Sequence, residues 1–169
     1  MSRTLTPRPL APDAFAPFGD VLDARGTADR TINEGRCGRF HDRARLDFDD
    51  GRAGISIFAS DTVSPPFDLH LVERHPLGSQ AFLPLHGAPW LMIVAPAGAD
   101  GPGTPSVFLV PPHTGVNLHR GTWHGVLTPL HAPGLFAVVD RIGDGANLEE
   151  HRFELPWRVV AGPRAEGAG

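Results

Sequence analysis

Short apolar runs, separated by glycine and proline, recur along the whole chain. The runs expected to form strands are 54–58, 67–72, 80–85, 89–95, 107–110, 125–127, 135–139 and 153–160. Run 89–95 is continuously apolar, as expected of a central strand buried on both faces. One short helical turn is expected at 12–18, because Pro12 lies near its start and Gly19 follows its end. Many short strands with turn residues between them predict an all-β sandwich or barrel.

The run that begins at Phe67 alternates apolar and polar residues with a period of two. Phe67, Leu69 and Leu71 share one face of the expected strand. Carried forward, this alternation places Glu73 and His75 on the same apolar face. An acid and an imidazole without partners are costly in such a place, so a functional site is expected there.

Composition supports a soluble globular protein and excludes several function classes. The chain has 20 glycines and 18 prolines in 169 residues, which favours a protein rich in turns. A net charge of −4 gives no basic face for nucleic acid. Cys37 is the only cysteine, and no run approaches the length of a membrane span, so we expect a cytoplasmic protein without membrane contact. Residues 1–169 are expected to form a single domain, with a disordered tail after about residue 163.

Two blocks of polar residues have the spacing of a metal site in a β-barrel. The first is Glu73-x-His75, then Gln80 and Gly87, and the second is His119-x-Gly121-x-x-His124. These spacings resemble the two motifs of cupins, with Glu, Gln and His119 replacing the usual residues. The spacing therefore predicts a cupin-like double-stranded β-barrel of the jelly-roll type with few short helices. Its expected metal ligands are Glu73, His75, Gln80 and His124.

A ligand set of oxygen and nitrogen without thiolate suits nickel, manganese, iron or zinc better than copper(I). Gln80 is the weakest member of the set, since an amide oxygen is neutral. The alternative is a polar pocket that binds a small acid without any metal.

Several segments together resemble the ureidoglycolate lyases of allantoin breakdown in purine catabolism. They are Ile32-Asn33-x-Gly35, residues 39–42, the block 73–84 (ERHPLGSQAFLP), residues 115–120, Trp123-His124 and Asp140-Arg141. The resemblance implies a cupin-type barrel, a homodimer, a divalent metal (Ni²⁺ is the one associated with the family) and cleavage of ureidoglycolate to glyoxylate and urea. Members of the family often have a second histidine where this chain has Gly125, and a tyrosine where it has Leu118.

That reaction suggests roles for further residues. His119, or Glu73 if it is not a ligand, would transfer the proton. Arg39 or Arg141 would bind the substrate carboxylate in a bidentate fork. Asn117 would hold the urea carbonyl.

Other interpretations remain open. A non-catalytic cupin that senses glyoxylate-like acids, or another metal cupin acting on a small hydroxy acid, would carry the same residues. Residues 39–42 also fit a solvated charge cluster, Asp140-Arg141 a surface ion pair, and residues 147–151 a solvated loop.

Overall fold

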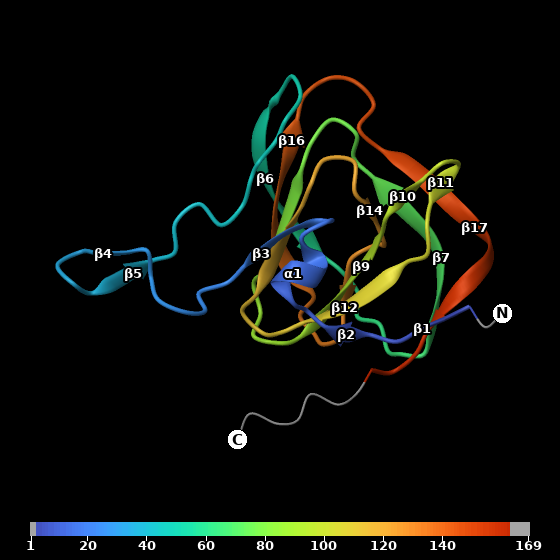
Figure 1. The fold of residues 1–169 in the computed structure, drawn as a ribbon, viewed down its shortest axis with the longest axis horizontal. Coiled ribbons are helices and arrows are strands. Elements are labelled where there is room, and N and C mark those ends of the chain that lie inside the picture. Colours follow the sequence, from blue (N-terminus) through green and yellow to red (C-terminus); the bar gives the residue numbers. More distant parts are fainter. Residues whose placement is uncertain (1–2, 163–169) are drawn as a thin grey trace.

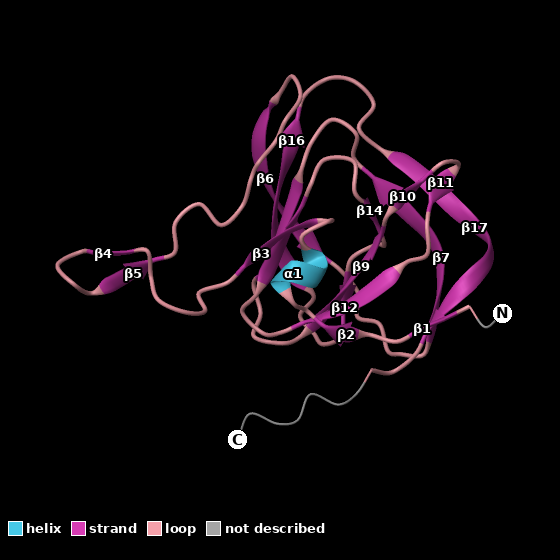
Figure 2. Cartoon of the chain, viewed as in Figure 1, coloured by secondary structure: helices cyan, strands magenta, loops and turns pink. Residues whose placement is uncertain are grey.

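Two β-sheets face each other in the computed structural model, which describes residues 3–162 (Figure 1). Strands and loops make up nearly all of it, and Figure 2 shows one short helix, α1 (Pro12–Phe15). The helix begins at Pro12, as the sequence predicts. The all-β, cupin-like barrel is therefore confirmed as the fold class. The expected tail after residue 163 lies outside the described residues.

The larger sheet has eight strands, and β15 (Thr128–Pro129) pairs with β9 beside the main path. The order along that path is β1 (Thr4–Leu5), β17 (Glu149–Val159), β7 (Phe67–Arg74), β14 (Trp123–His124), β9 (Trp90–Ala95), β12 (Ser106–Val110) and β2 (Arg8–Pro9).

The smaller sheet has five strands. Their order is β3 (Gly19–Leu22), β13 (Gly115–Leu118), β8 (Gln80–Pro84), β16 (Leu135–Ile142) and β6 (Arg52–Ala59). Two small hairpins complete the fold, β10 (Ala97–Gly98) with β11 (Gly101–Pro102), and β4 (Arg30–Ile32) with β5 (Cys37–Arg39). The β4–β5 hairpin projects away from the barrel (Figure 1).

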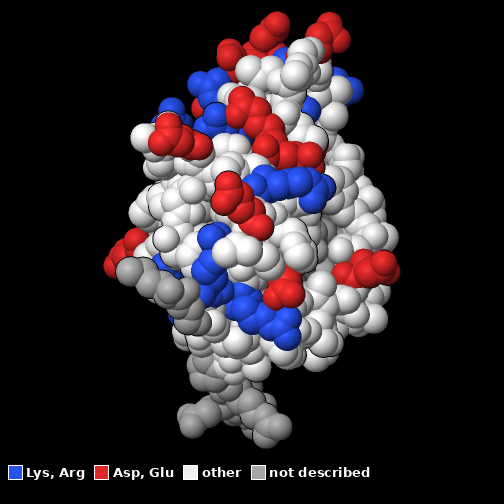
Figure 3. Space-filling model, turned by 90° about the vertical axis from the view of Figure 1, so that its right-hand side faces the viewer, with Lys and Arg blue, Asp and Glu red and all other residues white. Residues whose placement is uncertain are grey.

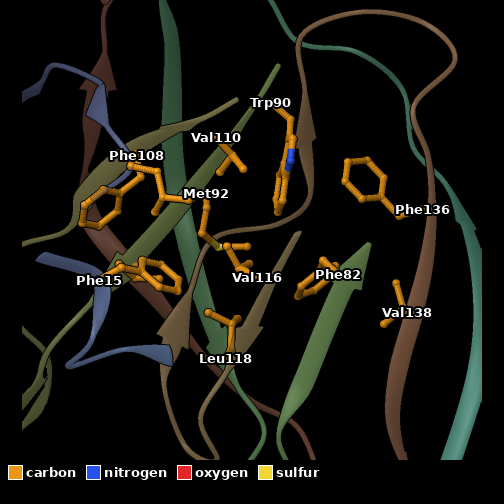
Figure 4. Packing of buried hydrophobic residues seen from close by; sticks show 12 residues of the cluster. Phe15, Phe82, Trp90, Met92, Phe108, Val110, Val116, Leu118, Phe136 and Val138 are labelled. Atoms are coloured by element: carbon orange, nitrogen blue, oxygen red, sulfur yellow. The ribbon is translucent and has the colours of Figure 1, made fainter. Parts of the chain in front are cut away.

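The two faces of β9 belong to two different hydrophobic clusters, which explains the continuous apolar run. Trp90, Met92 and Val94 point between the two sheets and pack with residues of β8, β12, β13 and β16 (Figure 4). Leu91 and Ile93 point the other way, where the large sheet curls and brings residues of β1, β7 and β17 against them. All six residues of β9 are buried, so it is the central strand that the sequence predicts.

Two details of the predicted strands are wrong. Residues 125–127 form no strand, because the chain leaves β14 there and rejoins β9 only at β15. The alternation in β7 is also interrupted: Leu69 and Val72, three residues apart, pack in the same cluster. Opposite this point the pairing of β17 with β7 shifts register, between Arg152 and Trp157. Glu73 therefore lies on the opposite face from Leu69, the face that looks between the sheets.

The outer face of β7 and β17 carries charged side chains of both signs among uncharged ones (Figure 3). Ion pairs join Arg74 to Glu149 and Arg158 to Asp68 across these strands. Within residues 3–162, no helix has the length and apolar character needed to cross a membrane.

Candidate metal centre

Glu73, His75 and His124 converge at one end of the barrel interior. Each offers one ligand atom, and these three atoms all lie within 4.8 Å of one another. Glu73 is directly opposite His124 in the pairing of β7 with β14, and His124 is opposite Val94 of β9. Opposite residues share a face of the sheet, so both side chains point toward the space between the sheets.

The tautomers of both imidazoles follow from their hydrogen bonds. His75 Nδ1 lies 2.6 Å from the Asn147 carbonyl oxygen, and His124 Nδ1 lies 2.9 Å from the Gly125 carbonyl oxygen. A carbonyl oxygen only accepts, so each Nδ1 carries the hydrogen and each Nε2 keeps its lone pair. Both Nε2 atoms are buried without a hydrogen-bond partner. This is the arrangement of metal-binding histidines, which donate from the second ring nitrogen to a carbonyl or carboxylate.

Gln80 lies on the same interior surface, contributed by the smaller sheet. It is opposite Leu118 of β13, whose side chain belongs to the core between the sheets. Only 6% of Gln80 is exposed, and its Oε1 is buried without a hydrogen-bond partner. Three buried acceptor atoms without donors, beside a carboxylate, are costly unless a cation neutralises them. The residues present therefore fit a divalent metal.

Burial determines the charge state of this cluster. It lowers the pKa of His124 to about 4, so the ring is neutral near pH 7. Burial also raises the pKa of Glu73, an effect that the nearby His75 opposes and Glu150 reinforces. Burial thus favours the neutral imidazole of His124, which is the form that binds a metal, and a bound cation would favour the ionised form of Glu73.

Asn117 and His119 belong to a different polar cluster, which Asp20 of β3 organises. Asp20 Oδ1 accepts from His119 Nε2 at 3.1 Å, and Asp20 Oδ2 accepts from Asn117 Nδ2 at 2.9 Å. The backbone N–H of Arg45 donates to the same Oδ2 at 2.9 Å. Burial alone would raise the pKa of Asp20, but these hydrogen bonds lower it, so the carboxylate stays charged.

This second cluster opens into a cleft of about 360 Å³. The cleft is lined by Arg45, Asp47, His119 and Arg120. Its loop is anchored to the metal-binding cluster, because Gly121 donates its backbone N–H to the His75 carbonyl oxygen at 2.9 Å. Arg120 is shared between Asp47 and Asp49, whereas Arg45 has no ionic partner among the described residues.

The structure gives no support to the predicted roles of Asn117, Arg39 and Arg141. Asn117 donates from Nδ2 to both Asp20 and the Arg45 carbonyl oxygen, which leaves no amide hydrogen for a urea carbonyl. Arg39 is exposed on the projecting β4–β5 hairpin. Arg141 is buried and donates to the carbonyl oxygens of Asp49 and Asp144, so it ties two loops together. It is not the surface ion pair that Asp140-Arg141 also suggests.

Sequence reasoning missed Asn147 and Asp20. The sequence around Asn147 indicates a solvated loop, yet the Asn147 carbonyl orients His75 and its Oδ1 accepts from the Leu77 N–H at 2.8 Å. Asp20 stands in a segment with no histidine or motif nearby. Only the pairing of β3 with β13 brings it opposite Asn117.

Comparison with known proteins places the chain in a family. A family model described as ureidoglycolate lyase matches residues 2–160. A ureidoglycolate lyase of Rhodobacter capsulatus is 58% identical over 155 residues, which cover 89% of this chain and 94% of that relative. Ureidoglycolate lyase 2 of Rhizobium meliloti is 47% identical, covering 90% of this chain and 94% of its own. A ureidoglycolate lyase of Pseudomonas syringae pv. tomato is 45% identical over 97% of this chain and 98% of its own. The chain belongs to the ureidoglycolate lyase family.

Proposed function

We propose that this protein is a ureidoglycolate lyase, which cleaves ureidoglycolate to glyoxylate and urea with the help of a bound divalent metal. The observation that carries the proposal is the convergence of Glu73, His75 and His124, with both imidazole Nε2 atoms buried and unpartnered. The relatives described above are named for this reaction.

Glu73, His75, Gln80 and His124 would hold the metal, and Ni²⁺ is the metal we propose from the family resemblance. When bound, it supplies Lewis-acid stabilisation of negative charge on the hydroxyl and carboxylate oxygens of the substrate. The carbonyl oxygens of Asn147 and Gly125 accept from Nδ1 of His75 and His124, so each imidazole has the tautomer in which Nε2 can bind the metal.

The chemistry requires one proton to move from oxygen to nitrogen. Ureidoglycolate carries a hydroxyl and a ureido group on the same carbon. As the hydroxyl loses its proton, the carbonyl of glyoxylate forms, and the electron pair of the broken carbon–nitrogen bond goes to the leaving urea nitrogen. That nitrogen then takes up a proton, so a single group can accept and return it.

His119 is the residue we propose for this transfer. Asp20 is acceptor-only, so His119 Nε2 donates to it and Nδ1 keeps a free lone pair. A carboxylate that fixes the tautomer and orientation of an imidazole base is a recurring catalytic arrangement. Arg45 lines the same cleft and has no ionic partner within residues 3–162, and it is the guanidinium we propose for the substrate carboxylate.

We also propose that the protein forms a homodimer. The outer face of the smaller sheet supports this assembly, because Ile55 and Ile57 of its edge strand β6 are 77% and 63% exposed. Leu83 of β8 and Leu85, the residue after β8, are also exposed hydrophobic residues.

The activity is tested by incubating the purified protein with ureidoglycolate and assaying urea and ammonia separately. We expect urea and glyoxylate in equal amounts, together with bound metal in the purified protein. His124→Ala should lose the metal and at least about 100-fold of the turnover, because it removes a ligand. His131→Ala, which changes an exposed histidine, is the control and should retain both.

Ammonia released without urea would contradict the elimination and indicate an amidohydrolase. Tight glyoxylate binding without urea release would indicate a sensor. Full turnover in metal-free protein would remove the metal from the mechanism.

A further inference from the structure

Asp140 is a buried acid that the mechanism above does not use. It stands on β16 two residues after Val138, whose side chain packs in the core between the sheets. Side chains two residues apart on a strand share a face, so Asp140 also points between the sheets. Its Oδ1 is buried without a hydrogen-bond partner.

The strand register makes Gln80 the neighbour of Asp140. Val138 is opposite Phe82 and Val139 is opposite Ala81 in the antiparallel pairing of β16 with β8. The paired residues end there, and the same register carried one residue further brings Asp140 opposite Gln80, the first residue of β8. The Cβ atoms of such cross-strand neighbours lie about 4.5–5.5 Å apart, within reach of a side-chain hydrogen bond.

The directly opposite residue on β6 and the same-face residues along β16 offer Asp140 no donor. On its second side, β6 places Gly54 opposite it, which has no side chain. Along β16, the residues on the same face are Val138 and Ile142, both apolar. Among these nearest neighbours, Gln80 is the one whose side chain carries N–H groups. The diagonal positions on β6 hold Ser56 and Arg52, and Arg52 Nη1 donates to the Ala53 carbonyl oxygen at 3.1 Å.

Gln80 also has a buried polar atom without a hydrogen-bond partner. Its Oε1 is buried without a donor, and its neighbours within the sheet on that face, Phe82 and Leu118, are apolar. Turning the amide so that Nε2 faces Asp140 pairs a donor with the buried Oδ1. The same turn directs Gln80 Oε1 away from the acid.

We propose that Asp140 is a positioning residue of the metal centre: it accepts a hydrogen bond from Gln80 Nε2 and so makes Gln80 a metal ligand through Oε1. Because this inference deepens the proposed function, it rests on the metal assigned there. The hydrogen bond to Asp140 would fix the orientation of the Gln80 amide. An amide held in one orientation presents its oxygen in one direction, as a metal ligand must. Outer partners of metal ligands typically contribute about 10–100-fold to metal affinity.

The experiment is a double-mutant cycle on metal affinity, measured without substrate. Ni²⁺ is titrated by calorimetry into chelator-treated, full-length protein carrying Asp140→Ala, Gln80→Ala or both. Asp140→Ala should raise the Kd for Ni²⁺ about 10–100-fold in the wild-type background. In the Gln80→Ala background the same substitution should change the Kd by less than about twofold, because the group through which Asp140 acts is already absent. Asp140→Asn, which keeps an acceptor oxygen, should show an intermediate loss.

Asp61→Ala, which removes an exposed acid, is the control and should leave the Kd unchanged. Equal losses in the two backgrounds would overturn the proposal, since Asp140 would then act without Gln80. A lower melting temperature with an unchanged Kd would overturn it as well and leave Asp140 a purely structural residue. Wild-type protein that binds no Ni²⁺ would overturn both this inference and the metal assignment, whereas failure of the urea assay alone would leave the cycle valid.

Discussion

His124 is the residue whose burial has the most direct consequence for stability. Only 2% of it is exposed, and burial lowers its pKa from 6.5 to about 4. Between these two pH values the unfolded chain binds a proton that the folded chain does not, so acid favours unfolding. In metal-free protein we expect the free energy of unfolding to contain a contribution from His124 that is complete above pH 6.5. This contribution, roughly 3 kcal/mol, should be lost as the pH falls toward 4.

Denaturant unfolding at several pH values, for the wild type and His124→Gln, isolates this contribution. Glu73 works in the opposite direction, because its raised pKa gives stability that is present at low pH and lost as the pH rises. It titrates in both proteins, so it cancels in the difference between them. The difference in unfolding free energy should therefore shrink from pH 6.5 to pH 4, and parallel curves would contradict the assignment.

The sequence could predict those residues of the centre that lie in a motif. The spacing predicts Glu73, His75 and His124, whose ligand atoms the structure brings together, and it adds Gln80, which stays a proposed ligand. Asp140 could not be recognised, because only the register of β16 on β8 brings it near Gln80. An acid at the end of an apolar strand is equally typical of a surface position. Asn147 was out of reach for another reason. It acts on His75 through its backbone carbonyl, a group that every residue carries.

At the scale of elements, the sequence predicts which segments form strands, but it does not predict where the pairing of two strands shifts register. The apolar runs predict β6, β7, β8, β9, β12, β16 and β17, and each of these strands except β6 has at least one buried residue. The pairing of β17 with β7 shifts register opposite Leu69 and Leu71. The side chains of β7 after this point lie on the opposite face from the one that the alternation predicts. The sequence of β7 alone does not indicate this shift. The alternation predicts that Glu73 shares a face with Leu69. That prediction is wrong, because Glu73 lies on the opposite face, between the two sheets.

The loop between β16 and β17 positions His75 through Asn147. The Asn147 carbonyl oxygen accepts from His75 Nδ1, and its side-chain Oδ1 accepts from the Leu77 N–H. Asn147→Ala should lower the stability by about 1 kcal/mol or more, because it leaves the Leu77 N–H without its acceptor. It should also raise the Kd for Ni²⁺ about tenfold, since the carbonyl that orients the imidazole is held less firmly. Thermal melts and metal titration measure the two effects.

Leu148→Ala is the matched control for this loop, because Leu148 is the next residue and its side chain is exposed. It should change neither quantity. If Leu148→Ala weakened metal binding as much as Asn147→Ala, general loosening of the loop would explain the loss and the specific contact would not.

At the scale of the whole molecule, the two outer faces differ in kind. The face of β7 and β17 carries acidic and basic side chains joined in ion pairs (Figure 3). The outer face of the smaller sheet instead has an apolar row across three strands, in which Ile57, Ala137 and Leu83 are directly paired. It ends at β6, which has the sheet's free edge and neither proline nor an internal charge. Soluble proteins normally protect such an edge, so we expect a second copy to cover it.

Ile57→Asp should therefore convert the proposed dimer to a monomer. A stable dimer needs roughly 800 Å² of well-packed surface per partner, and a buried unpaired carboxylate is costly within that surface. Light scattering after gel filtration measures the mass. Leu155→Asp is the control, because Leu155 is 64% exposed on β17, outside the smaller sheet. That variant should keep the wild-type mass. A monomeric wild type, or an Ile57→Asp variant that remains dimeric, would show that this face is not where the subunits meet.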